Sequence, residues 1–261
     1  MYRLIFFPFL LFCCSPPAPS TAEATASLVS DSLPVSEIEP VRVVDWQSYG
    51  IQIAPTDQAY AEVLADIRTK KEALRLAWQS DQVSLDSVGK VFTACLVNDI
   101  MPYWYGTPWD FEGHTDIPNE GQIACGYLVS TTLKHLGLNL NRYKLAQQAA
   151  LNEAKTLALG ADIVSMIRMP LARVIEQIKS DFQEGLYLVG LDYHVGLILY
   201  QNGEVFFIHS SLYEPVSVVI ELAETAAALL YNDDYYFAPI SNNPALMKAW
   251  LQNTALKIVS Q

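Results

Sequence analysis

The sequence predicts an α+β fold in which helices pack on an antiparallel sheet. From residue 56 to residue 182, apolar residues recur mainly at helical spacing. After Gly185 the apolar segments are short, alternating, and rich in β-branched and aromatic residues, as in strands. Asn202-Gly203 separates two of these segments and is a strong signal for a tight hairpin. Helices followed by hairpin-linked strands are typical of α+β domains.

The helices are expected in the first two thirds of the chain. Thr56, followed by Asp57, is a suitable N-cap for the first of them, and Pro170 suits the first turn of the last. An aromatic loop with several prolines and glycines separates the second helix from the third. The predicted helices span 56–78, 85–101, a segment starting near Cys125, 143–159 and 170–182.

The strands are expected in the last third. The segments LYLVGLD, HVGLILYQ and EVFFIHS come first, and VSVVI and DYYFAPI follow. Between the last two lies ELAETAAALL, residues 221–230, whose composition favours a helix.

The first residues resemble a bacterial lipoprotein signal. Arg3 precedes an apolar run of about ten residues, which is too short to span a bilayer and ends at Cys13-Cys14. In such signals the cysteine after the cleavage site is lipidated, and Cys14 fits that position. An ordinary secretory signal or a short membrane anchor is the alternative. We expect a lipid-anchored, extracytoplasmic protein of the bacterial cell envelope, organised as a signal peptide (1–14), a flexible tether (15–40), a helical extension (41–101) and a main domain (102–261).

Charge and cysteine content narrow the function classes. A net charge of −12 without Lys/Arg clusters argues against nucleic acid as a partner. Beyond the signal only Cys95 and Cys125 remain, too few for a disulfide framework, although one bridge between them stays open. The chain has no Gly-rich phosphate loop and no CxxC-pair or HExxH motif, so no cofactor or metal is predicted.

The hairpin brings two histidines together. If Asn202-Gly203 form a two-residue turn, Gln201 faces Glu204, and counting back places Gly196 opposite His209. Because side chains alternate along a strand, His194 then lies on the same face as His209, at diagonal-neighbour distance. Such a pair can bind a metal with further ligands such as Asp192 and Cys125, can be structural, or can act as a base and its orienting partner.

Cys125 opens the third predicted helix. A helix N-terminus lowers a thiol pKa and favours the nucleophilic thiolate. The alternative is packing, because Cys125, Val129, Leu133 and Leu136 form one helical stripe.

These motifs together resemble the NlpC family of papain-like cysteine endopeptidases of bacterial cell walls. The family's nucleophile motif corresponds to Cys125-Gly126-Tyr127-Leu128-Val129, its base to the first residue of His194-Val195-Gly196, and its orienting residue to His209 in FIHSS. The segment GTPWDFEG resembles the family's upstream turn, with Trp109 where a tyrosine is usual. The resemblance covers residues 103–240.

The resemblance implies a papain-like fold and a Cys-His-His hydrolase acting on peptide amides of peptidoglycan. Trp109 and Gln122 are candidates for the oxyanion or substrate site. Ala124 replaces the family's Asp before the cysteine, and Gly126-Tyr127 replaces Ser-Gly after it. The alternative is therefore an inactive papain-fold lipoprotein that binds a cell-wall peptide or a protein partner. Of the other histidines, His114 is expected in solvent. His135 is expected to be structural, near a helix C-terminus whose dipole favours a histidine cation.

Overall fold

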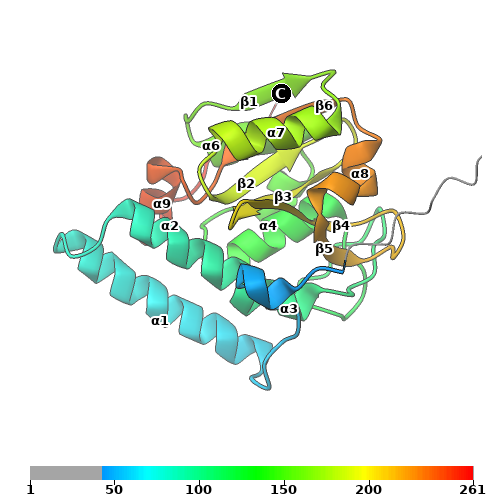
Figure 1. Ribbon diagram of the computed structural model, residues 1–261. Coiled ribbons are helices and arrows are strands. Elements are labelled where there is room, and N and C mark those ends of the chain that lie inside the picture. The colour runs from blue at the N-terminus through cyan, green and yellow to red at the C-terminus, as the bar shows by residue number, and fades with distance from the viewer. Residues whose placement is uncertain (1–42, 261) are drawn as a thin grey trace, which may run out of the picture. The chain divides into compact units, whose positions relative to one another are not determined.

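The computed structural model describes residues 43–260, and residues 44–260 belong to one compact unit. It confirms the α+β class, with helices on an antiparallel sheet (Figure 1). The predicted signal peptide, the predicted lipidation site Cys14 and the whole predicted tether (15–40) lie outside the described residues. Within the described part of the chain, no helix combines the length and apolar character needed to cross a bilayer.

The sheet has six strands in the order β1-β6-β2-β3-β4-β5, all paired antiparallel. The predicted strand segments all form strands, and β1 is an additional edge strand that the sequence analysis does not predict. The bounds are β1 Val164–Ile167, β2 Gly185–Gly190, β3 Val195–Gln201, β4 Glu204–Ser210, β5 Val218–Leu222 and β6 Asp234–Pro239.

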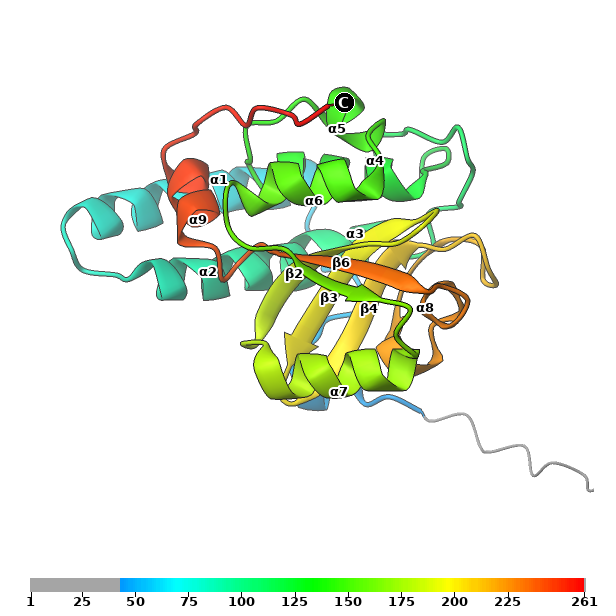
Figure 2. The same ribbon diagram turned by 90° about the horizontal axis from the view of Figure 1, so that it is seen from above.

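Most helices lie on one face of the sheet, whereas α7, η3 and α8 contribute to the core on the other face (Figure 2). The helical elements are η1 Trp46–Tyr49, α1 Tyr60–Gln79, α2 Leu85–Ala94, η2 Cys95–Ile100, α3 Met101–Trp104, α4 Cys125–His135, α5 Arg142–Ala146, α6 Ala150–Ala158, α7 Leu171–Asp181, η3 Ala223–Thr225, α8 Ala227–Leu230 and α9 Pro244–Leu251.

Three helix predictions change in detail. Helix α1 begins at Tyr60 rather than near Thr56, and the Glu62 carboxylate accepts from the Ala59 backbone N–H. The second helix turns into a π-helical segment, η2, from Cys95 onward. The predicted 143–159 helix breaks into α5 and α6 because each half packs elsewhere, α5 on α4 and α6 on the sheet strands β2 and β6.

The sheet is buried on both faces because successive strand residues enter different cores. In β4, Phe206 and Ile208 join the larger core under α4, whereas Val205 and Phe207 join the smaller core under α7. The helices α1 and α2 contribute Val63, Ile67, Val88 and Phe92 to the larger core, so they pack in the same core as the main domain.

The β3–β4 hairpin has the predicted register. Gln201 pairs with Glu204, and the turn residues Asn202 and Gly203 have φ of 52° and 74°, as a type I′ turn requires. The strand pairing runs back to Leu197 opposite Ile208, so the next residues outward are Gly196 and His209.

Candidate active site

The candidate site lies at the edge of the sheet where β3 begins and β4 ends. His194 immediately precedes β3, and His209 is the last residue but one of β4. Strand β5 begins at the same edge, because His209 pairs with Val219 and Ser210 with Val218. Elements distant in sequence therefore converge on the two histidines.

The histidines form the predicted pair. His194 Nε2 and His209 Nδ1 are 2.9 Å apart, which is a hydrogen bond between the two rings. Both side chains are withdrawn from solvent, with residue exposures of 7% for His194 and 0% for His209. Burial lowers the pKa of His194 to about 3, with His209 as a second cause, and burial also lowers the pKa of His209. Both rings are therefore neutral near pH 7.

Gly196 leaves the space that this pair needs. A Cβ atom at this position would lie 2.5 Å from Phe207 Cε2 and 3.0 Å from the Cβ of His209. The Phe207 ring stacks on the His209 ring at a centroid distance of 4.1 Å. The absent side chain thus lets Phe207 hold His209 against β3.

A carboxylate completes the line of polar groups. Glu221 Oε1 lies 2.9 Å from His209 Nε2, and the Glu221 side chain is 30% exposed. The carboxylate raises the pKa of His209, opposing the larger effect of burial. One hydrogen-bonded line therefore runs from solvent at Glu221 through His209 to His194.

Cys125 is the first residue of α4, as predicted. The loop before it is held by main-chain bonds: Ile123 N–H donates to the Pro108 carbonyl at 2.9 Å, and Ala124 N–H to the Gly113 carbonyl at 2.8 Å. The Ser210 hydroxyl donates to the Ile123 carbonyl at 2.7 Å. The end of β4 thereby fixes the start of α4 beside the histidine pair.

The thiol does not have the lowered pKa expected at a helix N-terminus. Burial raises the pKa of Cys125, and Glu153 raises it further when it is ionised. Hydrogen bonding from the backbone N–H groups of Val195, Gly126 and Cys125 acts in the opposite direction without prevailing. Residue Cys125 is nevertheless partly exposed, unlike the buried Cys95, and both cysteines are free rather than bridged.

The thiol interacts with the strand that follows His194, but not through the imidazole rings. Among residues 43–260, no hydrogen bond joins Cys125 to either imidazole. The connection runs through Val195, the residue after His194, whose backbone N–H interacts with the sulfur. Val195 belongs to the larger core, on which Cys125 packs, whereas the rings of His194 and His209 contact Phe207 of the smaller core.

Glu153 lies next to the start of α4. Its Oε1 would be 3.0 Å from a Cβ atom on Gly126, and the residue is 1% exposed. Its Oε2 has no hydrogen-bond partner among the described residues. Burial raises the pKa of this carboxyl well above its usual value, so the group is held in its neutral form.

The predicted oxyanion candidates make no polar side-chain contact with the thiol. The Trp109 backbone N–H donates to the Val216 carbonyl at 3.0 Å, and its side chain is half-buried. Gln122 is exposed and lines a surface hollow with His114 and Tyr143. His114 is exposed, as expected, and its ring packs against Tyr127 and Tyr143.

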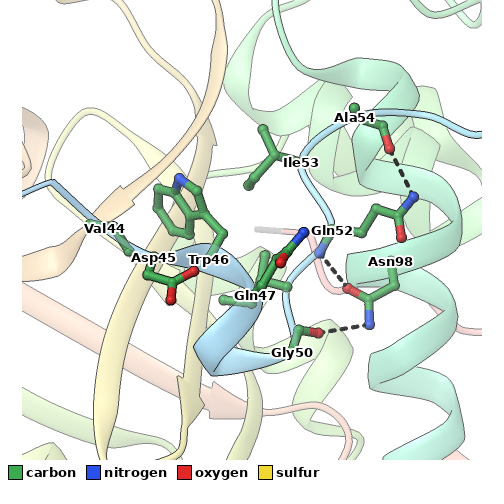
Figure 3. Close-up of a pocket in the computed structure, with 10 residues that line it drawn as sticks. Val44, Asp45, Trp46, Gln47, Gly50, Gln52, Ile53, Ala54 and Asn98 are labelled. Atoms are coloured by element: carbon green, nitrogen blue, oxygen red, sulfur yellow. Dashed lines mark hydrogen bonds between the residues drawn. The ribbon is translucent and has the colours of Figure 1, made fainter.

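A surface hollow of about 690 Å³ lies elsewhere, beside η1 and η2. Asn98 crosses it, accepting from the Gln52 backbone N–H at 3.0 Å and donating to the Gly50 carbonyl at 3.1 Å (Figure 3). None of the predicted site residues lines this hollow, so we do not assign the chemistry to it. The described residues contain no cluster of three or more His, Cys, Asp or Glu side chains placed to hold a metal ion.

His135 makes structural contacts, as expected, but its ring is neutral rather than the cation that a helix C-terminus favours. Its Nδ1 lies 2.9 Å from the Tyr60 hydroxyl, and burial lowers its pKa to about 4. The Trp104 indole N–H donates to the same hydroxyl at 2.9 Å. The histidine is thus a neutral link between α1, α3 and α4.

Sequence reasoning missed Glu221 and Glu153. Glu221 stands in the segment predicted as helical, whereas β5 continues through it to Leu222 opposite β4. Glu153 looks like an ordinary surface residue of a polar helix, and the break between α5 and α6 is what turns it inward.

No family model matches the chain, and comparison with curated proteins and with solved structures likewise finds no match.

Proposed function

We propose that the chain is a cysteine hydrolase of amide bonds, with Cys125 as nucleophile and His194 as base. The observation that carries the proposal is the buried His194–His209 hydrogen bond of 2.9 Å at the sheet edge where α4 begins with a partly accessible cysteine. A nucleophile, a base and a group that orients the base are the parts that covalent acyl transfer requires.

The proton path follows from the hydrogen bond that already occupies one nitrogen of the His194 ring. His194 Nε2 is bonded to His209, so Nδ1 is the nitrogen that takes the Cys125 proton. The sulfur attacks the amide carbonyl carbon, the C–N bond breaks, and the leaving amine takes the proton from His194. Water then attacks the thioester with His194 again as base, releasing the acid and restoring the thiol.

Because Cys125 and His194 are both neutral before reaction, the order of proton transfer and attack can be inferred. The raised pKa of Cys125 and the His194 pKa of about 3 disfavour a preformed thiolate–imidazolium pair. Proton transfer therefore accompanies attack, as in general-base catalysis. The Cys125 backbone N–H at the start of α4 is a suitable oxyanion donor, with Trp109 or Gln122 as a second donor after side-chain movement.

The substrate class rests on the resemblance to the NlpC family and on the predicted lipoprotein signal. We propose a peptide amide of peptidoglycan, cleaved by an enzyme anchored in the cell envelope through Cys14. The motifs that carry this are Cys125-Gly126, His194-Val195-Gly196 and the Ile208-His209 strand end.

The test is hydrolysis of peptidoglycan stem peptides by the purified chain, followed by mass spectrometry. Cys125→Ala and His194→Ala should each abolish turnover while circular dichroism and thermal unfolding stay native-like. His114→Ala, at an exposed histidine near the site, is the matched control and should keep full activity. Turnover by Cys125→Ala equal to that of the parent chain would exclude this function.

A second candidate is a binding module with an inactive papain-like site, which holds a cell-wall peptide or a protein partner. The raised thiol pKa and the missing thiol–imidazole hydrogen bond favour it. Calorimetric titration with the same stem peptides separates the two. A binding module binds them equally well with and without the Cys125 thiol and releases no product.

A further inference from the structure

Glu221 ends the line of polar groups behind His194. We propose that Glu221 is a positioning residue, which fixes the tautomers of His209 and His194 and balances the positive charge that His194 gains. The tautomer part follows from the contacts of the described residues. The catalytic part rests on the proposed hydrolase function.

The tautomers of His209 and His194 both follow from the Glu221 carboxylate, which acts as a hydrogen-bond acceptor. An ionised carboxylate only accepts hydrogen bonds, so His209 Nε2, 2.9 Å from Glu221 Oε1, must carry a hydrogen. A neutral ring then has a lone pair on Nδ1. That lone pair accepts from His194 Nε2 at 2.9 Å, so the second ring also carries its hydrogen on Nε2. The remaining nitrogen, His194 Nδ1, is left with the lone pair that a base needs.

The Glu221 carboxylate also stabilises the positive charge that develops on His194 during the proposed reaction. His194 becomes an imidazolium when it takes the thiol proton, and its buried position penalises that charge. Glu221 is the carboxylate that contacts the pair within the described residues, and it acts through His209. On the thiol's side, Glu153 of α6 raises the pKa of Cys125 only when it is ionised, and burial favours its neutral form.

Glutamine at position 221 keeps the size and shape of the side chain, but it no longer fixes the direction of the hydrogen bond with His209. An amide can accept from His209 Nε2–H through its oxygen, or donate to a bare Nε2 through its nitrogen. The second arrangement reverses both rings and places a hydrogen on His194 Nδ1, which removes the base. Glu221→Gln therefore separates charge and tautomer from packing. Glu176→Gln, at an exposed acid of α7 paired with Arg173, is the matched control.

The first measurement is the ¹⁵N NMR spectrum of histidine-labelled full chain at pH 7.5. The parent and Glu176→Gln should show both rings of the pair protonated on Nε2 and bare on Nδ1. Glu221→Gln should show a mixture or a reversal of the two tautomers, while thermal unfolding stays close to that of the parent. An unchanged Nε2-protonated pair in Glu221→Gln overturns the inference.

The second measurement is the pH dependence of Cys125 alkylation by iodoacetamide, followed by mass spectrometry. A loss of about one pKa unit in His194 basicity corresponds to about tenfold slower alkylation at neutral pH in Glu221→Gln and Glu221→Ala. Because Glu221 is 30% exposed, formate should enter the space in Glu221→Ala and restore part of the rate. Equal rates in the parent and both variants overturn the inference.

The failure of this inference differs from failure of the proposed function. Reversed tautomers with slowed alkylation, in a chain that cleaves no amide, support Glu221 as the positioning residue and reject the hydrolase. Amide cleavage that persists unchanged in Glu221→Gln, with unchanged tautomers, rejects Glu221 and leaves the hydrolase standing.

Discussion

Glu153 combines nearly complete burial, one oxygen without a partner, and a position against the first turn of α4. A carboxyl kept neutral by its surroundings binds its proton more tightly in the folded chain than in the unfolded chain. Folded stability contributed by this group is therefore present at low pH and lost as pH rises above the ordinary Glu value of about 4.3.

Glu153→Gln should remove that loss. We expect the melting temperature of the variant, relative to the parent, to increase steadily between pH 5 and pH 9 in scanning calorimetry. Alkylation of Cys125 at alkaline pH should also become faster, because the charge that raises the thiol pKa is gone. Glu176→Gln on the surface of α7 should follow the parent at every pH. Parallel curves for Glu153→Gln and the parent would contradict the assignment.

At the residue scale, a feature is predictable from sequence when it depends on the residues themselves rather than on distant neighbours. Asn202-Gly203 predicts its turn because the required positive φ is a property of those two residues. Glu221 belongs to a strand only because β4 lies beside it and pairs Phe207 with it. The site's histidines were therefore predictable from the hairpin, whereas the carboxylate behind them was not.

At the scale of elements, the Tyr60 hydroxyl is one of the polar links between α1 and the main domain. Tyr60 receives the Trp104 indole N–H and contacts His135 Nδ1, each at 2.9 Å. Loss of this hydroxyl leaves the fully buried Trp104 indole without its acceptor, which costs about 1–3 kcal/mol.

Tyr60→Phe should accordingly lower the free energy of unfolding by about 1–3 kcal/mol in urea titrations. Tyr193→Phe is the matched control, because Tyr193 is 97% exposed, and it should change stability by less than about 0.5 kcal/mol. If both variants lose the same amount, the Tyr60 network does not hold α1 in place.

The hairpin gives a second test at this scale. Gly196→Ala places a methyl group 2.5 Å from the Phe207 ring, so the ring must move away from His209. We expect a loss of about 1–3 kcal/mol, as for overpacked cores. Phe207→Leu in the same chain should cost less than it does alone, a coupling that a double-mutant cycle measures. Additive effects would mean that the ring and the methyl group do not meet.

Elements also differ in how far sequence predicts them. Helix α9 is absent from the sequence prediction, although the sequence carries its signals: Asn243 caps it and Pro244 occupies its first position. The break between α5 and α6 was not, because Ala149 and Ala150 favour helix. The break follows from docking: Ala150 packs against Gly190 of β2, and the Ala146 carbonyl packs against Gly126 of α4.

Over the whole molecule, two buried histidines and one half-buried histidine, His135, make the fold less stable in acid. Burial lowers the pKa of His135 to about 4 and of His194 to about 3, and it lowers that of His209. Below the ordinary histidine pKa of about 6.5, these three histidines bind protons in the unfolded chain but stay neutral in the folded chain. Stability is therefore fully present above about pH 6.5 and is lost as pH falls toward 4 and below.

Unfolding free energies from urea titrations at pH 7, 6, 5 and 4 should fall along that series. His135→Phe removes one of the three contributions, worth at most about 3 kcal/mol for a pKa lowered from 6.5 to about 4. The variant should therefore lose less stability than the parent between pH 7 and pH 4. His114→Phe, at an exposed histidine, should keep the parent's slope, and a shared slope in all three chains would refute the assignment.

The loop before Cys125 has irregular secondary structure yet is tied into the sheet. Gly106 N–H donates to the Val218 carbonyl and Val218 N–H to the Thr107 carbonyl, each at 2.9 Å, and Ile123 follows through Pro108. Amide hydrogens at Gly106, Ile123 and Ala124 should consequently exchange with deuterium as slowly as those of a regular strand. Exchange there requires β5 to detach, so these amides and those of β5 should open as one cooperative unit. The residue that begins α4 and the carboxylate on β5 are thus released together or not at all.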